Sequence, residues 1–378
     1  MVLMDVKLAN IYGFEDFHLN LSYPRRLANS TIENEFLLAR PNFKYKKAII
    51  LMGANATGKT TLGKALNCIF NYMSNGNPEA LYEMIGNPSR PAHFKIEFVN
   101  TLQYKLIRFF VKINPPSKRL VNASPVVENY YSSCDIRLTD SYESCVKQLD
   151  STVFVPIQPL NFNALFVNVG YRFCLAGQQN LVDINVSRNR DLFLKTLRCI
   201  ILTLDPSFTS VNDSKEFSDS FVLKRGSTQI LIQKGVLQDN KGILSTGTRE
   251  GISIAILLAA MKQHLNGFYY CDEQFSHIQT DLEKRLFGMM VSSLGDGEQL
   301  IFTSHNSDMQ DMNLPKHTFV YLVKEKEEGF FNTYAVSASD YLKRPTDSVR
   351  SAAENDVFST VPDDSLLDLI DSEDNDDG

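Results

Sequence analysis

Residues 53–60 constrain this chain more than any other segment, because they match the phosphate-binding pattern G-x-x-x-x-G-K-[ST]. In this pattern, glycines let the backbone N–H groups wrap phosphates, the lysine neutralises β- and γ-phosphate oxygens, and the final hydroxyl binds Mg²⁺. Lys59 is therefore the predicted cation and Thr60 a predicted Mg²⁺ ligand. The residues expected to contact ATP here are Gly53, Asn55, Ala56, Thr57, Gly58, Lys59, Thr60 and Thr61.

The flanking sequence supports this interpretation. Residues 48–52 form a continuous apolar run, which predicts a buried parallel strand entering the loop. After the loop, apolar residues recur with the spacing of one helix face from Leu62 to Met73. Strand, loop and helix are the context that a phosphate loop requires, whereas a glycine loop that merely precedes a helix is the alternative.

An acidic pair follows a second apolar strand at 268–271. We expect Asp272 to hold the Mg²⁺ shell and Glu273 to align the attacking water, because phosphoryl transfer depends on positioning and charge stabilisation. Without the phosphate loop, the same pair would be read as the start of a surface turn.

Two further motifs lie at the ends of predicted elements. Ser245 and Gly247 precede a helix, where they form either an anion site or an ordinary N-cap. A buried strand at 299–303 leads to His305, which either senses a terminal phosphate or has a structural role. The chain order of the four motifs favours the functional interpretation of each.

The remaining pattern predicts an α/β protein with a mainly parallel sheet covered by helices. Residues 6–10 and 17–21 indicate a first hairpin, and 94–99 with 104–108 indicate an antiparallel pair. We predict helices at 192–204, 252–265 and 282–291 and irregular structure over 120–150.

Composition excludes some classes of protein. The six cysteines are scattered singly, which argues against a disulfide framework or a zinc site. No apolar run approaches the roughly 20 residues of a membrane span, so we expect a soluble, cytoplasmic protein without membrane contact. Eight acids in the last sixteen residues exceed the whole formal charge of −6 and leave +2 on the rest. Acidity is therefore no argument against a DNA partner.

The chain resembles the compact ABC-type ATPases, related to RecF, SMC and OLD proteins and frequent in bacterial anti-phage and abortive-infection modules. The segments that carry the resemblance are GANATGKTT, LSTGTREGISIAILLAAM, FYYCDEQFSHI, LIFTSHNSDM and LPKHTFVYLVKEKEEGFFNTYAVSASDYL. It implies one ATPase head over 1–345 and an acidic C-terminal extension over 346–378. Within the head it implies a phosphate-loop lobe at 1–85, an antiparallel β and helical insertion at 86–243, and a lobe at 244–345 with the helical signature subdomain.

The resemblance also implies that two heads dimerise head-to-tail around ATP, as a homodimer or a higher homo-oligomer. Ser245 and Gly247 would then contact the γ-phosphate of the other copy, and Ser276 would lie in a loop at the interface. His305 would be the switch histidine. Gln158, after an apolar run at 153–157, is the expected glutamine that senses Mg²⁺ and the attacking water.

Several positions depart from the family pattern. The signature reads STGT rather than SGGQ, which argues against a transporter motor, and Gln279 stands where relatives often carry histidine. There is no long coiled coil, and the chain is too short after His305 for a Toprim nuclease. We therefore expect a regulatory ATPase of a defence or toxin-type module, paired with a separate nuclease or toxin as effector. The alternative is a RecF-like DNA-repair ATPase.

Overall fold

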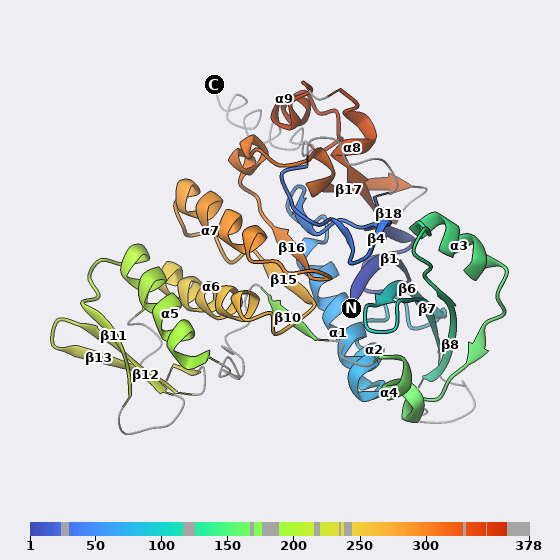
Figure 1. Ribbon diagram of the computed structural model, residues 1–378, viewed down its shortest axis with the longest axis horizontal. Helices are drawn as coiled ribbons and strands as arrows, with labels where there is room; N and C mark the ends of the chain where they lie inside the picture. Colours follow the sequence, from blue (N-terminus) through green and yellow to red (C-terminus); the bar gives the residue numbers. More distant parts are fainter. Residues whose placement is uncertain are drawn as a thin grey trace, which may run out of the picture.

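A six-stranded sheet forms the centre of the protein in the computed structural model (Figure 1). The structure describes residues 1–23, 30–115, 125–166, 170–175, 189–214, 220–233, 236–237, 244–327, 330–344 and 346–360. In spatial order the strands are β10 (Tyr171–Cys174), β15 (Phe268–Asp272), β16 (Gln299–Thr303), β5 (Ala48–Met52), β17 (Phe319–Glu327) and β18 (Phe330–Ser337). The first five are parallel and β18 is antiparallel to β17.

Both faces of this sheet are covered, which explains the continuous apolar run of β5. Ile49 and Leu51 face a core that contains α1 (Lys59–Asn75). Ala48, Ile50 and Met52 face a second core, formed with helices from the later part of the chain. These helices are α5 (Arg190–Leu204), α6 (Thr246–Lys262) and α7 (Thr280–Ser292). The prediction of a mainly parallel sheet between helices is confirmed.

An antiparallel sheet lies on the α1 side of the molecule, shown in blue to green in Figure 1. Its strands in spatial order are β2 (Phe17–Asn20), β1 (Val2–Ala9), β6 (Ala92–Asn100), β7 (Lys105–Asn114), β8 (Val126–Asp135) and β9 (Val155–Pro156). The predicted hairpin and the predicted antiparallel pair are both present. The prediction of irregular structure over 120–150 was wrong for the described residues of this range, because β8 and α3 (Tyr142–Asp150) lie there.

A lobe projects from the central sheet where α5 packs on α6, at the left of Figure 1. It also carries a small antiparallel sheet, which the sequence did not predict. Its strands are β11 (Ser210–Asp213), β12 (Ser220–Arg225), β13 (Thr228–Gln233) and β14 (Val236–Leu237). The remaining short elements are β3 (Phe36–Leu37), β4 (Arg40–Lys44), α2 (Glu79–Tyr82), η1 (Pro159–Asn161), α4 (Phe162–Leu165), η3 (Ser307–Asp311) and η4 (Lys316–Thr318).

The chain after β18 continues through α8 (Ala338–Tyr341) and α9 (Val349–Glu354). Phe358, 1% exposed, stacks on Tyr321 of β17 with 4.3 Å between ring centroids. The expected extension at 346–378 therefore packs on the head up to this point, and its acidic residues at 361–378 lie outside the described residues. In the part of the chain that the structure describes, no helix is long and apolar enough to cross a membrane.

Candidate nucleotide-binding site

The phosphate loop connects the carboxyl end of β5 to the first turn of α1. Gly53 and Gly58 have φ values of 141° and 107°, which side-chain-bearing residues rarely adopt. A Cβ on Gly53 would lie 2.5 Å from the carbonyl oxygen of Leu322. Asn55 and Ala56 are exposed at the tip of the loop. The glycines thus let the backbone take a path that leaves the N-terminus of α1 open to an anion.

Lys59 folds back over this loop. Its Nζ donates hydrogen bonds to the carbonyl oxygens of Gly53 (2.8 Å) and Ala54 (3.1 Å) and lies 3.4 Å from Nδ1 of His305. Burial lowers the pKa of Lys59, while Glu273 and Asp272 act in the opposite direction. The ammonium group is therefore held at the loop by neutral acceptors that stronger anionic acceptors can replace.

The acidic pair lies at the end of β15, which pairs directly with β16. Asp272 is fully buried, and its Oδ1 accepts a hydrogen bond from the hydroxyl of Thr303 (2.9 Å). The same hydroxyl accepts a hydrogen bond from the backbone N–H of Glu273 (2.9 Å). Thr303, which the sequence analysis did not single out, therefore orients both acids.

Glu273 and His305 form an ion pair or hydrogen bond of 2.6 Å between Oε1 and Nε2. Because the Lys59 ammonium can only donate to Nδ1, the arrangement favours the tautomer in which Nε2–H donates to Glu273. Glu273 itself has φ 48°, in the left-handed region. Three segments that are far apart in sequence thus place the imidazole of His305 in contact with both a cation and a carboxylate.

Glu283 on α7 holds the segment that carries His305. It accepts hydrogen bonds from Ser304 Oγ (2.7 Å) and Asn306 Nδ2 (2.7 Å), the residues on either side of His305. Burial raises the pKa of Glu283, and these two hydrogen bonds oppose the shift. The sequence analysis did not identify Glu283 as a site residue. It lies on the buried face of α7 with Phe287 and Met290, and an acid on an apolar face is a pattern that could have indicated it.

The two strongest motifs are also joined through the core. The hydroxyl of Tyr270 on β15 donates to the backbone carbonyl of Lys59 (2.7 Å), and Tyr270 is fully buried. Gly63 allows this contact, because a Cβ there would lie 2.6 Å from the Tyr270 ring. The first turn of α1 is therefore fixed to the strand that ends in the acidic pair.

Ser245 and Gly247 belong to a second cluster, at the start of α6. Ser245 is the N-cap and accepts a hydrogen bond from the N–H of Thr248 (3.1 Å). Gly247 lies against the loop after the acidic pair, since a Cβ on it would be 3.2 Å from the carbonyl oxygen of His277. Among the described residues, Ser245 and Gly247 contact the first turn of α6 and the loop after the acidic pair.

Glu250 ties α6 to that loop. Its carboxylate accepts hydrogen bonds from Ser276 Oγ (3.2 Å), His277 N–H (3.2 Å) and His277 Nδ1 (2.7 Å). Ser276 also donates to the carbonyl oxygen of Glu273 (3.1 Å). Ser276, the predicted interface residue, therefore connects α6 to the acidic pair, and α6 begins at the turn of residues 245–247, here called the signature turn.

Gln158 does not join either cluster. It is exposed and directly precedes η1. Pro159 of η1 lies against Gly76, because a Cβ added to Gly76 would be 2.8 Å from the Pro159 side chain. Gly76 caps the C-terminus of α1, and a 17-residue helix is about 25 Å long. Gln158 thus lies at the opposite end of α1 from the phosphate loop and cannot sense Mg²⁺ in this arrangement. The strand beside β15, β10, ends level with Cys271, and the chain after it at 176–188 lies outside the described residues.

The donor set suits a magnesium–triphosphate group. Mg²⁺ prefers carboxylate and hydroxyl oxygens together with phosphate oxygens, and Thr60 and Asp272 supply the two protein groups. Thr60 is half-buried in the first turn of α1, next to Lys59, and Thr61 follows it. The residues present therefore fit both ATP and Mg²⁺.

Comparison with solved structures identifies the fold. An SMC head bound to the C-winged helix domain of ScpA aligns over 90% of this chain and 100% of its own, with 14% identity and a TM-score of 0.53. An SMC head domain with an extended coiled coil, bound to the C-terminal domain of ScpA derived from Pyrococcus furiosus, aligns over 90% and 98%, with 11% identity and a TM-score of 0.55. No protein-family model and no curated protein match the sequence. The chain has the fold of SMC head domains.

Proposed function

We propose that this chain is an ABC-type ATPase that binds Mg-ATP at residues 53–61 and hydrolyses it to ADP and phosphate. The observation that carries the proposal is the contact of His305 with both Lys59 and Glu273, beside Asp272. The SMC-head fold adds support, because it supplies the frame in which the phosphate loop and the acidic pair lie on neighbouring parts of one sheet.

Lys59 and the loop bind the triphosphate. In the proposed complex, Lys59 exchanges the carbonyl oxygens of Gly53 and Ala54 for β- and γ-phosphate oxygens, which accept charge-assisted hydrogen bonds. Thr60 and Asp272 would hold Mg²⁺, which when bound would supply positive charge beside the phosphate oxygens. Backbone N–H groups at the start of α1 complete the cradle.

Glu273 positions the attacking water, and His305 orients Glu273 through the 2.6 Å contact. Most of the catalytic effect comes from this positioning, because phosphoryl transfer leaves little covalent chemistry to the protein. We further propose that Ser245, Gly247 and Ser276 act on the nucleotide of a second copy, so that two heads enclose each ATP.

The test is Glu273→Gln, which keeps the shape of the side chain and removes its charge. We expect ATP turnover to fall by roughly 10²–10⁴-fold, the usual contribution of a side chain that positions a reacting water and accepts its proton. ATP binding should persist and the ATP-bound dimer should accumulate, as seen by light scattering. Glu83→Gln, an exposed position, is the matched control. Unchanged turnover in Glu273→Gln would overturn the assignment.

The cellular role that we propose is regulation of a separate effector in a defence or toxin-type module. The sequence resemblance supports it, while the fold is compatible with several roles. Affinity purification of the tagged protein from its native host, with and without Mg-ATP, tests this role. Recovery of a nuclease or toxin supports it, whereas a dimer that retains DNA and no effector favours the RecF-like alternative.

A further inference from the structure

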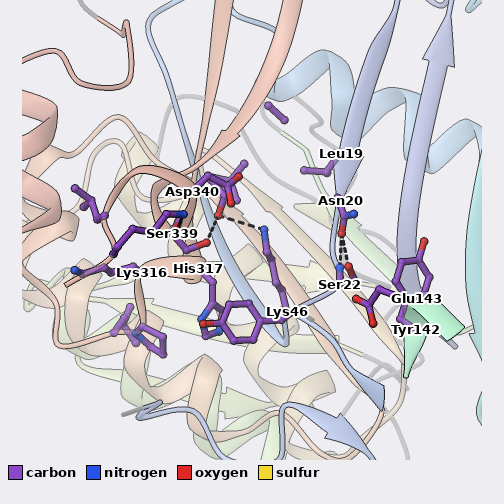
Figure 2. A pocket seen from close by; sticks show the side chains of 18 of the residues that line it. Leu19, Asn20, Ser22, Lys46, Tyr142, Glu143, Lys316, His317, Ser339 and Asp340 are labelled. Carbon is purple, nitrogen blue, oxygen red and sulfur yellow. Dashed lines mark hydrogen bonds between the residues drawn. The ribbon is translucent and has the colours of Figure 1, made fainter. Parts of the chain in front are cut away.

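A basic cavity of about 850 Å³ lies away from the nucleotide site, at the amino end of β5. The five residues of β5 separate it from the phosphate loop by about 17 Å. Figure 2 shows Lys46 pointing toward Ser339 and Asp340, with Asn20, Ser22 and Glu143 on the facing side. The cavity is therefore a second site, built from β2, α3, η4 and α8.

The charge of the lining favours an anion. Five cationic side chains and two acidic ones line the cavity, and the acids are Glu143 and Asp340. The cations are Lys46, Lys147, Lys316, Lys343 and Arg344. Lys46 is 6% exposed, and its Nζ donates to the hydroxyl of Ser337 (3.3 Å). A buried ammonium is stabilised when a carboxylate reaches it, because a hydroxyl only partly replaces the water that it has lost.

The lining is also partly apolar. Leu19, Val146, Leu314, Pro315 and Leu342 lie between the cations. An occupant that carries both carboxylates and aliphatic side chains would match the cavity better than a simple ion.

The chain contains one segment with this chemistry. Residues 361–378 hold eight acids and no basic residue, and the sequence LLDLI at 366–370 lies among them. The segment also starts close to the cavity. Phe358 contacts the ring of Tyr341, at 5.8 Å between centroids, and Tyr341 belongs to the helix that supplies Ser339 and Asp340. The eight residue-to-residue steps from Phe358 to Leu366 can span up to roughly 26 Å.

We propose that the acidic segment 361–378 docks in this cavity within the same chain, with its aspartates on the lysines and its leucines on the apolar lining. Tethering makes the docking intramolecular, with an effective concentration on the order of millimolar. The proposal does not depend on ATP hydrolysis.

The test uses a chain that ends at Thr360 and a fluorescent peptide of residues 361–378, followed by fluorescence anisotropy at low salt. We expect the peptide to bind the truncated chain and to bind the full chain at least about tenfold more weakly, because the tethered copy competes. No binding to the truncated chain, or equal binding to both chains, would overturn the proposal.

Two controls separate docking from general charge attraction. Lys147→Glu with Lys343→Glu reverses two exposed charges of the lining and should weaken binding by about tenfold, whereas Lys262→Glu at the end of α6 should not. A peptide in which the leucines and isoleucine of LLDLI are serine keeps every charge and should bind more weakly. If it binds as well as the parent peptide, or if the lining variants bind normally, the cavity is not the docking site.

Discussion

Lys46 and Lys59 are buried on opposite sides of β5 in the sequence, and their neighbouring groups affect their ammonium groups differently. Lys59 lies beside Glu273 and Asp272, which counteract the effect of burial on its pKa. Lys46 has a hydroxyl as its hydrogen-bond acceptor, and burial lowers its pKa to about 8 against the more distant charges of Asp340 and Glu35. In the proposed complex, the first would bind a ligand with several negative charges, whereas the second carries a desolvation penalty in the chain ending at Thr360.

This penalty predicts a pH dependence of stability. Lys46 has a pKa of about 8 in the folded state and of 10.5 in the unfolded state. As the pH falls below 10.5, the unfolded state therefore takes up the proton first. In the chain ending at Thr360, the free energy of unfolding should therefore rise by about 3 kcal/mol between pH 8 and 10.5, relative to Lys46→Met. Urea unfolding of both proteins across this range measures the difference. The same comparison with the exposed Lys262→Met should give parallel curves, and parallel curves for Lys46→Met would contradict the prediction.

At the scale of elements, two helix glycines differ in what surrounds them. Gly63 in α1 faces the Tyr270 ring, which would lie 2.6 Å from a Cβ, and Leu175, at 2.8 Å. Gly288 in α7 has no heavy atom within 4 Å of its Cβ position. The Tyr270 ring cannot yield easily, because its hydroxyl is bonded to the carbonyl of Lys59.

We therefore expect opposite effects from the same substitution. Gly63→Ala should destabilise the protein by about 1–3 kcal/mol through overpacking. Gly288→Ala should stabilise it by about 0.5–1 kcal/mol, because alanine is the better helix residue. Chemical unfolding gives both values, and a loss of stability in Gly288→Ala would show that α7 is packed more tightly there than the structure indicates.

The elements also explain which features the sequence could predict. The strands β5, β15 and β16 are short apolar segments that are buried on both faces. Their apolar pattern and the polar residues that follow each strand were sufficient to predict them. The strand β8 was missed because its most buried side chains are polar, Asn129 and Ser132, and Asn129 is there to accept a hydrogen bond from Tyr72 (2.7 Å). Gln158 was assigned to the wrong place for a different reason. The apolar run before it does not indicate which sheet the run joins, and its strand β9 belongs to the antiparallel sheet.

At the scale of the whole molecule, the predicted nucleotide residues fall into two clusters within one chain. Lys59, Asp272, Glu273 and His305 meet at the carboxyl edge of the central sheet. Ser245, Gly247 and Ser276 gather around the start of α6, where Glu250 holds the loop. In the proposed dimer, a symmetric pair would place the second cluster of each copy opposite the first cluster of the other.

Mixing two inactive variants tests this composite site. Lys59→Ala disables the phosphate loop and Ser245→Arg disables the signature turn, so each variant alone should hydrolyse almost no ATP. In a mixed dimer, one interface combines both defects and the other combines the intact phosphate loop of one chain with the intact signature turn of its partner. Equal mixing should therefore restore about a quarter of the wild-type rate, since about half of randomly formed dimers are mixed and each has one functional interface. A mixture as inactive as its components would mean that each chain needs both clusters for its own ATP. Recovery of turnover shows that the signature turn acts across the interface, because neither chain then contains a complete site.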